Sequence, residues 1–300
     1  MYGKVTSKAG AVRGLPSARG RAKALAGAVL AAAGTLALGA APAQAKPIYL
    51  PELFAKGTNG YKIQVGGFRG VSVLATKGPR KRLLSASYDV RNGKSTGKVL
   101  RADLGRFGYV DMRFVPKGKP RKRMPRGCSG KPDLVQRGVW KGRLRFEGHN
   151  GFTKVNVRSA RGKVTRFGVQ NCEERGSAGG RFVELFAVRK RGKTQTFFGV
   201  EKRDRPSAKP SFSAYHRFKV GDVRVGLAAF YRGKPKQFIF SAPEPSGNAD
   251  VNPKGPFSGS AAYSNGSWSG NLAVKLPGKR VKLTGRGFKA SLGLTEEVAE

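Results

Sequence analysis

The sequence predicts an all-β protein of antiparallel sandwich or barrel-like modules, and three observations lead to this prediction. Short runs that alternate apolar and polar residues recur through residues 46–300, as expected of strands with one buried face. Glycine (43 residues) and proline (17 residues) are frequent and fall mostly between these runs. After the first 45 residues no long run has the 3.6-residue period of a helix, so no substantial helix is expected.

The first 45 residues have the features of a secretory signal peptide. Six cationic residues and no acidic residue accompany an uncharged, Ala- and Leu-rich run at 24–42. Ala43-Gln44-Ala45 then provides a small-x-small cleavage site. We expect cleavage after Ala45 and a secreted, extracellular product with no transmembrane segment in the mature chain. An uncleaved membrane anchor is the alternative, because about 20 apolar residues can span a bilayer.

The first predicted module covers residues 46–175. Alternating runs at 61–65 and 84–90 predict strands, and Asn92-Gly93 supplies a turn after the second run. The next strand is expected to place Val110, Met112 and Phe114 on one face.

The clearest predicted strand covers residues 140–147. Trp140, Gly142, Leu144 and Phe146 occupy alternate positions, and three cations fall between them. Period-two geometry then places Lys141, Arg143 and Arg145 on one face at intervals of about 6.6 Å. Further strands are expected at 153–158 and 164–169.

Two groups of cations are the candidate anion-binding residues. One is the row on the strand at 140–147, and the other is a Pro- and Lys-rich loop at 115–126, which is expected to be exposed. Ordinary solvated surface is the alternative interpretation of both groups. The candidate residues are Lys117, Lys119, Arg121, Lys122, Arg123, Arg126, Lys141, Arg143 and Arg145.

Cys128 and Cys172 are the only two cysteines, and in an oxidising compartment they predict one disulfide. Such a bridge would pin the end of the basic loop and stabilise the fold by at most about 4 kcal/mol. A metal site is the alternative, with His149 between the cysteines. Zinc needs four ligands, however, and no spacing motif is present, so no metal site and no cofactor are expected.

The second predicted module covers residues 180–295, after a polar, Gly-rich break at 173–181. The segment at 241–258 is rich in Pro, Gly and Asn and is expected to be an exposed connection. Strands are expected at 182–188, 197–200, 212–220, 223–231 and 238–240, followed by a meander over 260–294.

An internal echo connects the two modules. "GVWKGRLRF" at 138–146 and "GSWSGNLAV" at 266–274 share Gly-x-Trp-x-Gly-x-Leu and contain both tryptophans of the chain. The echo predicts two related halves. Chance similarity between Gly-rich strands and one large double-layered fold are the alternatives. The Gly between Trp and Leu is expected to let the indole lie flat against the backbone.

Several of these sequence segments resemble segments of known protein families. The Trp140–Phe146 strand between the two cysteines, together with "PFSGSAAY" and "WSGNLAVKLPGKRVKLTG", resembles uncharacterised secreted β-rich proteins of soil actinobacteria, a group with no known activity. The Gly-x-Trp element is also similar to that of the calycin barrels, lipocalins included, where it lies near the first strand. Neither resemblance implies ligand residues.

The charge balance favours polyanions as partners. Removing the six cations of the first 45 residues leaves 53 Lys and Arg against 17 Asp and Glu, a net charge of +36. Such an excess favours association with anionic polymers and opposes self-association, so a monomer is expected. Maintaining solubility is the alternative role for this charge.

No catalytic motif occurs, and no catalytic residue is predicted. His216 is expected to be a buried core histidine on the face of Phe212, Ala214 and Phe218. His149 falls in a tight turn, where histidine tolerates unusual backbone angles. The acids on or beside predicted strands are best explained as counter-charges; they are Glu147, Glu184, Glu201 and Asp222.

The function expected from these observations is non-catalytic and electrostatic. The aromatic residues share faces with Val, Leu and Ala, so base stacking and sequence-specific nucleic-acid binding are not expected. We therefore expect a secreted protein attracted to anionic cell-envelope or extracellular polymers. A secreted carbohydrate-active enzyme, which needs two facing carboxylates, and a lipocalin-like small-ligand carrier, which needs an apolar cavity, are the alternatives.

Overall fold

The computed structural model describes residues 47–68, 70–172, 180–203, 211–233, 238–241, 246–251, 255–265, 267–284 and 289–297. All of these residues belong to one compact unit that spans Ala41–Glu300. The predicted signal peptide and most of the predicted break at 173–181 lie outside the described residues.

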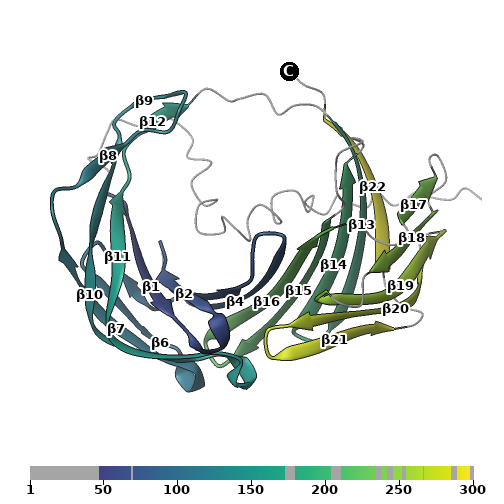
Figure 1. The fold of residues 1–300 in the computed structure, drawn as a ribbon, viewed down its shortest axis with the longest axis horizontal. Helices are drawn as coiled ribbons and strands as arrows, with labels where there is room; N and C mark the ends of the chain where they lie inside the picture. Colours follow the sequence, from purple (N-terminus) through teal and green to yellow (C-terminus); the bar gives the residue numbers. More distant parts are fainter. Residues whose placement is uncertain are drawn as a thin grey trace, which may run out of the picture. The chain divides into compact units, whose positions relative to one another are not determined.

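The described residues form 22 strands and three short 3-10 turns, which confirms the all-β prediction (Figure 1). The turns are Thr58–Gly60, Gly105–Phe107 and His149–Gly151. The first strands are β1 (Tyr49–Lys56), β2 (Lys62–Gly66), β3 (Val71–Lys77), β4 (Arg82–Val90), β5 (Lys94–Ser95), β6 (Val99–Asp103), β7 (Gly108–Pro116), β8 (Arg121–Arg123), β9 (Cys128–Gly130), β10 (Asp133–Glu147), β11 (Lys154–Arg166) and β12 (Gln170–Cys172). The later strands are β13 (Gly180–Arg191), β14 (Thr194–Arg203), β15 (Ser211–Val220), β16 (Val223–Arg232), β17 (Phe238–Ser241), β18 (Ser246–Val251), β19 (Phe257–Ser264), β20 (Ser267–Leu276), β21 (Lys279–Thr284) and β22 (Lys289–Glu297).

The strands pair antiparallel, mostly with their neighbours in the chain. β1 to β4 form consecutive hairpins, and β1 also pairs with β11. From β11 the pairing continues through β10 and β7 to β6. β13 to β16 form a second run of hairpins, and β13 also pairs with β22. β17 to β21 pair in sequence, and β9 pairs only with β12 in a separate two-stranded sheet.

The same order of pairing thus occurs twice in the chain. In each case a first strand starts four consecutive hairpin strands and also pairs with a strand near the end of its own part, β11 for β1 and β22 for β13. The fourth strands, β4 and β16, pair with each other, so hydrogen bonds cross the expected division between residues 46–175 and 180–295. The two first strands also share the tetrapeptide Glu-Leu-Phe-Ala, at 52–55 and at 184–187. Two related halves stay a prediction, and these observations favour it.

Trp140 belongs to the buried hydrophobic cluster, and its surroundings differ from the expectation. Its side chain is fully buried, and its Nε1 donates a hydrogen bond of 3.0 Å to the carbonyl oxygen of Glu52 on β1. A Cβ on Gly162 of β11 would lie 2.4 Å from that same Nε1. The glycine that admits the indole is therefore Gly162 on the neighbouring strand, and the expected role of Gly142 was wrong.

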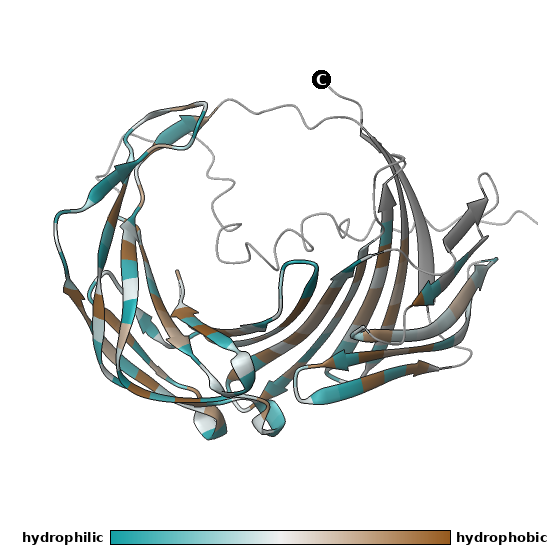
Figure 2. Cartoon of the chain, viewed as in Figure 1, coloured by the Kyte–Doolittle hydropathy of each residue, from teal (hydrophilic) through white to brown (hydrophobic). Residues whose placement is uncertain are grey.

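Gly142 instead forms a β-bulge. The register between β10 and β11 shifts between Lys141 and Leu144, and Gly142 has φ 141°. A Cβ there would lie 2.2 Å from the carbonyl oxygen of Asp111, so only glycine fits. Beyond the bulge Leu144 and Phe146 are buried again, and apolar and polar residues alternate along the strands (Figure 2).

Candidate anion-binding face and seam pocket

The predicted row on β10 is exposed and belongs to a wider group of cations. Lys141, Arg143 and Arg145 are exposed, whereas Leu144 and Phe146 beside them are buried. Directly opposite residues of paired strands share a face, and on that basis exposed arginines of β7 and β11 join the row. We call this set the basic face: Arg113, Lys141, Arg143, Arg145 and Arg161.

Acidic residues near the basic face are engaged with other cations. Asp111 of β7 is the register partner of Arg143 and forms an ion pair of 3.0 Å with Arg101 on β6. Glu147 at the end of β10 is paired at 3.0 Å with Lys154. Glu147 is therefore a counter-charge, as predicted, although its partner is Lys154 and not Arg145. Among the described residues no ion pair involves a member of the basic face.

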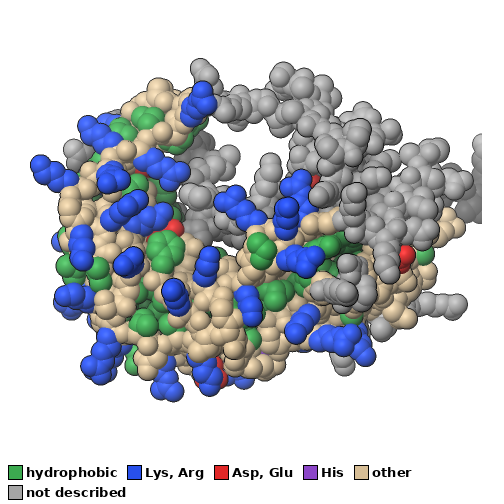
Figure 3. Space-filling view, viewed as in Figure 1, with side chains coloured by type: hydrophobic (Ala, Val, Ile, Leu, Met, Phe, Trp, Pro, Cys, Tyr) green, Lys and Arg blue, Asp and Glu red, His purple; other side chains and the backbone are tan. Residues whose placement is uncertain are grey.

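Two members of the basic face oppose each other directly. Arg113 on β7 and Lys141 on β10 are register partners, and like charges in directly opposite positions destabilise a sheet. Lys and Arg also outnumber Asp and Glu on the surface seen in Figure 3. The sheet therefore holds positive charge close together at some cost, and an anion placed over these strands would relieve that repulsion.

The basic loop is more ordered than expected. Lys117, Lys119 and Arg126 are exposed, as predicted. The central residues Arg121–Arg123 form strand β8, which pairs with the first residues of β10, and they are exposed as well. The expected exposed loop therefore contains a short strand, because β10 is longer than predicted and begins at Asp133.

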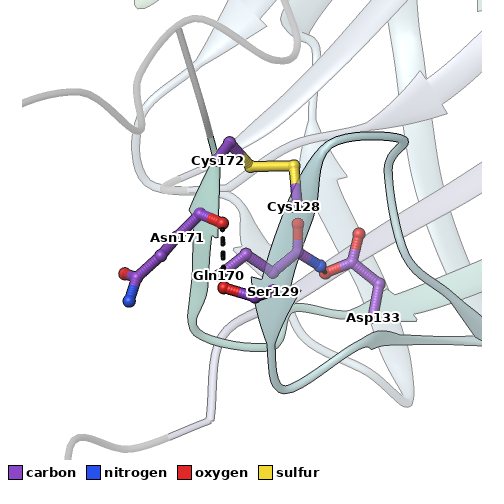
Figure 4. The surroundings of a disulfide bond; sticks show 6 residues. All are labelled: Cys128, Ser129, Asp133, Gln170, Asn171 and Cys172. Atoms are coloured by element: carbon purple, nitrogen blue, oxygen red, sulfur yellow. Dashed lines mark hydrogen bonds between the residues drawn. A yellow bond between two sulfur atoms is a disulfide. The ribbon is translucent and has the colours of Figure 1, made fainter.

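The disulfide between Cys128 and Cys172 is confirmed (Figure 4). The two cysteines are register partners in the β9–β12 pair. The Asp133 carboxylate next to this pair accepts hydrogen bonds of 3.0 Å from the backbone N–H of Gly168 and from the Gln170 side chain. These bonds hold the β12 segment against the start of β10 and so fix the end of the basic loop.

A pocket that sequence reasoning missed lies where β4 pairs with β16. It has a volume of about 260 Å³, and we call it the seam pocket. Gly67 and Phe68 of the β2–β3 turn form part of its wall. Its polar lining comes from β3, β4, the turn after β4, β15 and β16: Ser72, Asp89, Arg91, Tyr215, Arg217 and Arg224.

Several side chains of the seam pocket are held in place by their neighbours. Ser72 donates a hydrogen bond of 2.6 Å to Asp89. The Arg217 Nε donates a hydrogen bond of 3.4 Å to the Tyr215 hydroxyl, and its guanidinium lies 5.4 Å from the centre of the Tyr215 ring. A Cβ on Gly226 would lie 2.5 Å from the same hydroxyl, so this glycine makes room for the phenol.

The seam pocket and the basic face lie on the same face of the sheet. Six successive register pairs connect them: Arg161↔Phe54, Phe54↔Gln64, Gln64↔Leu74, Leu74↔Ser87, Ser87↔Gly226 and Gly226↔Arg217. Because directly opposite residues share a face, Arg161 and Arg217 point to the same side. Six inter-strand spacings correspond to about 29 Å along the sheet.

His216 is a buried core histidine, as expected, and is 4% exposed. The Lys279 Nζ donates to its Nε2 at 3.1 Å, so its Nδ1 carries the proton and donates to the Thr196 hydroxyl at 2.7 Å. Burial and the Lys279 charge, with a smaller effect from His149, lower the pKa of His216 to about 4.

His149 lies close to His216, which the sequence did not predict. The Phe218 ring contacts both imidazoles, with centroids at 5.0 Å from His149 and 5.5 Å from His216. Burial and the charges of Arg106 and Lys279 lower the pKa of His149 as well. In its turn the left-handed backbone conformation (φ 54°) belongs to Asn150 and not to His149.

Within the described ranges, no three His, Cys, Asp or Glu side chains gather in a way that could hold a metal ion. None of the helical segments in the same residues has the length and apolar character needed to cross a membrane.

Comparison with known proteins gives little. No family model and no curated protein matches the chain. A solved structure of a protein provisionally named AttH, from Nitrosomonas europaea, aligns with 83% of this chain and 92% of its own, at 8% identity and a TM-score of 0.23. A similarity this low supports no conclusion about this chain.

Proposed function

We propose that this chain is a secreted, non-catalytic β protein that associates electrostatically with anionic cell-envelope or extracellular polymers. The observation that carries the proposal is the basic face: five exposed cations on three paired strands, with the nearby acids engaged elsewhere. The exposed cations of β8 and its flanking loop lie beside the same long strand, β10.

The side chains of this face favour attraction to the negative charge of a polymer over recognition of a nucleic-acid sequence. Exposed Lys and Arg bind polyanions largely by releasing counterions, so such binding weakens as salt rises. The large aromatic residues of β10 are buried in the core and unavailable for stacking on bases. A linear polymer with regularly spaced carboxylate, sulfate or phosphate groups is therefore the expected partner.

Retention on immobilised heparin at rising salt tests the proposal. Reversing Lys119, Arg121, Lys122 and Arg123 to Glu is expected to lower the eluting salt concentration most. Reversing Lys141, Arg143 and Arg145 should lower it clearly as well. A matched control reverses three exposed cations elsewhere, Lys275, Arg280 and Lys282. Elution of the unaltered protein together with a neutral protein of the same size would end the proposal.

A carbohydrate-active enzyme is the second candidate, and one register favours it. Glu184 on β13 and Glu201 on β14 are register partners in the β13–β14 pair. Retaining glycosidases need two carboxyl groups about 5 Å apart. Incubating the protein and its Glu201→Gln variant with acidic polysaccharides tests this candidate: release of reducing ends by the first and not by the second would support it.

The small-ligand carrier has less support from the described residues. The interior around Trp140, Tyr88 and Phe146 is filled by these side chains, which are at most 1% exposed. The apolar pocket beside Trp268 has a volume of only about 10 Å³. Carriers of this kind hold their ligands in much larger apolar cavities.

A further inference from the structure

We infer that the seam pocket binds one carboxylate-bearing sugar unit, such as a uronate residue of an acidic polysaccharide. This inference builds on the proposed function, since it names a polymer class that the basic face would attract and a place where one of its units would be recognised. It can fail while the proposed function stands.

The arginines of the pocket supply the site for the carboxylate. Arg91, Arg217 and Arg224 line the same pocket of about 260 Å³ and come from the turn after β4, from β15 and from β16. A guanidinium can bind a carboxylate through two parallel N–H···O bonds, a geometry that an ammonium cannot match. Arg217 is already oriented by its hydrogen bond to Tyr215 and by its position over that ring.

The other groups that line the pocket match the uncharged part of a sugar, and a small inorganic anion would leave them without partners. The Asp89 carboxylate, held by the Ser72 hydroxyl at 2.6 Å, offers acceptors for sugar hydroxyls, which an inorganic anion lacks. The rings of Tyr215 and of Phe68, which is 39% exposed, provide apolar surfaces for the C–H face of a pyranose. The pocket volume lies just below the range of drug-sized ligands, as a single sugar requires.

Position on the sheet also favours a unit within a polymer over a free sugar. The seam pocket opens on the face that carries Arg161, about 29 Å away along the sheet. Aromatic rings of neighbouring strands continue from the pocket on the same face, with Tyr215 6.4 Å from Phe197 and Phe197 5.6 Å from Phe186. A chain bound at the pocket could thus extend over aromatic rings on one side and towards the basic face on the other.

Galacturonate and galactose provide a matched pair of probes, because they differ only in the carboxylate at C6. Backbone amide NMR shifts of the full-length secreted protein would be followed during titration with each sugar and with inorganic phosphate. Galacturonate is expected to shift the amides of Ser72, Arg217 and Gly226, whereas galactose at the same concentration does not. Arg224→Gln should weaken galacturonate binding at least tenfold. Arg232→Gln, at the end of the same strand, should leave it unchanged.

Each other outcome overturns the inference. Equal shifts with galactose would show that the carboxylate is not recognised. Displacement of galacturonate by an equal concentration of phosphate would show a general anion site. If galacturonate shifts none of the backbone amides that line the seam pocket while the protein is still retained on heparin, the inference about the pocket fails and the proposed function stands. Arg224→Gln should leave retention on dextran sulfate, a polyanion without carboxylates, within the range of the Arg232→Gln control, because the basic face is intact in both.

Discussion

His216 is expected to make the unfolding free energy depend on pH, because its proton is disfavoured in the folded protein. Its pKa is about 4 in the folded state, whereas an unfolded chain binds the same proton near pH 6.5. Between these values the unfolded state binds more protons, so the unfolding free energy falls as the pH drops from about 6.5 to 4. Above pH 6.5 the full stability is present.

The size of this effect follows from the two pKa values. The difference corresponds to a loss of at most about 3 kcal/mol when the pH falls through the whole window. His149 and Lys279 face His216, and Arg106 acts on His149, so every charged neighbour named here is cationic or becomes cationic and acts in the same direction. Carboxylates elsewhere also titrate at low pH, and a variant is needed to separate their contribution.

The free energy of unfolding in urea would be measured at several pH values between 7 and 4 for the unaltered protein and for His216→Gln. In this variant the glutamine side chain can still accept a hydrogen bond from Lys279. The stability difference between the two proteins is expected to shrink by up to about 3 kcal/mol as the pH falls. Proton NMR of the imidazole C2–H should place the His216 midpoint near 4, with His149→Gln used for assignment. A constant stability difference, or a midpoint near 6.5, would refute the reasoning.

Two further predictions concern the interior and the disulfide. Gly162→Ala should lower the free energy of unfolding by about 2–4 kcal/mol, because the new Cβ displaces the Trp140 indole and breaks its hydrogen bond to the Glu52 carbonyl oxygen. Denaturant unfolding measures the loss, and the tryptophan emission spectrum reports the displaced indole. An unchanged spectrum would contradict the packing. Replacing Cys128 and Cys172 by Ser should lower the free energy of unfolding by up to about 4 kcal/mol, because the disulfide closes a 44-residue separation. The replacement should also speed proteolysis near β8. Identical cleavage rates in the unaltered protein and the variant would show that the disulfide does not restrain this segment.

Local alternation predicted the part of the site that one strand forms. Lys141 and Arg145 alternate with buried residues over a short stretch, so their exposure followed from the sequence. β1 was missed because it does not alternate: four consecutive residues from Leu50 to Leu53 are buried, and one of them is a proline. The bulge at Gly142 was missed as well, since an extra residue depends on the partner strand.

The seam pocket could not be predicted, because its residues meet only through the β4–β16 pairing. Asp89 and Arg224 are 135 positions apart and become register partners. Arg217 and Arg224 also look like any other of the many cations of the chain. The Glu-Leu-Phe-Ala repeat at 52–55 and 184–187 is a sequence signal for the two-fold arrangement, because it lies in the first strand of each run of hairpins.

The most direct test of polyanion association is the salt dependence of heparin affinity, measured for three proteins. For the unaltered protein the logarithm of the association constant should fall linearly with the logarithm of the salt concentration. On the scale known for nucleic acids, each lost contact lowers the slope by roughly 0.7–0.9. Lys141, Arg143 and Arg145 changed together to Gln should therefore reduce the slope by roughly 2–3. The same change at Lys275, Arg280 and Lys282 should leave it nearly unchanged, and equal slopes for all three proteins would contradict the account.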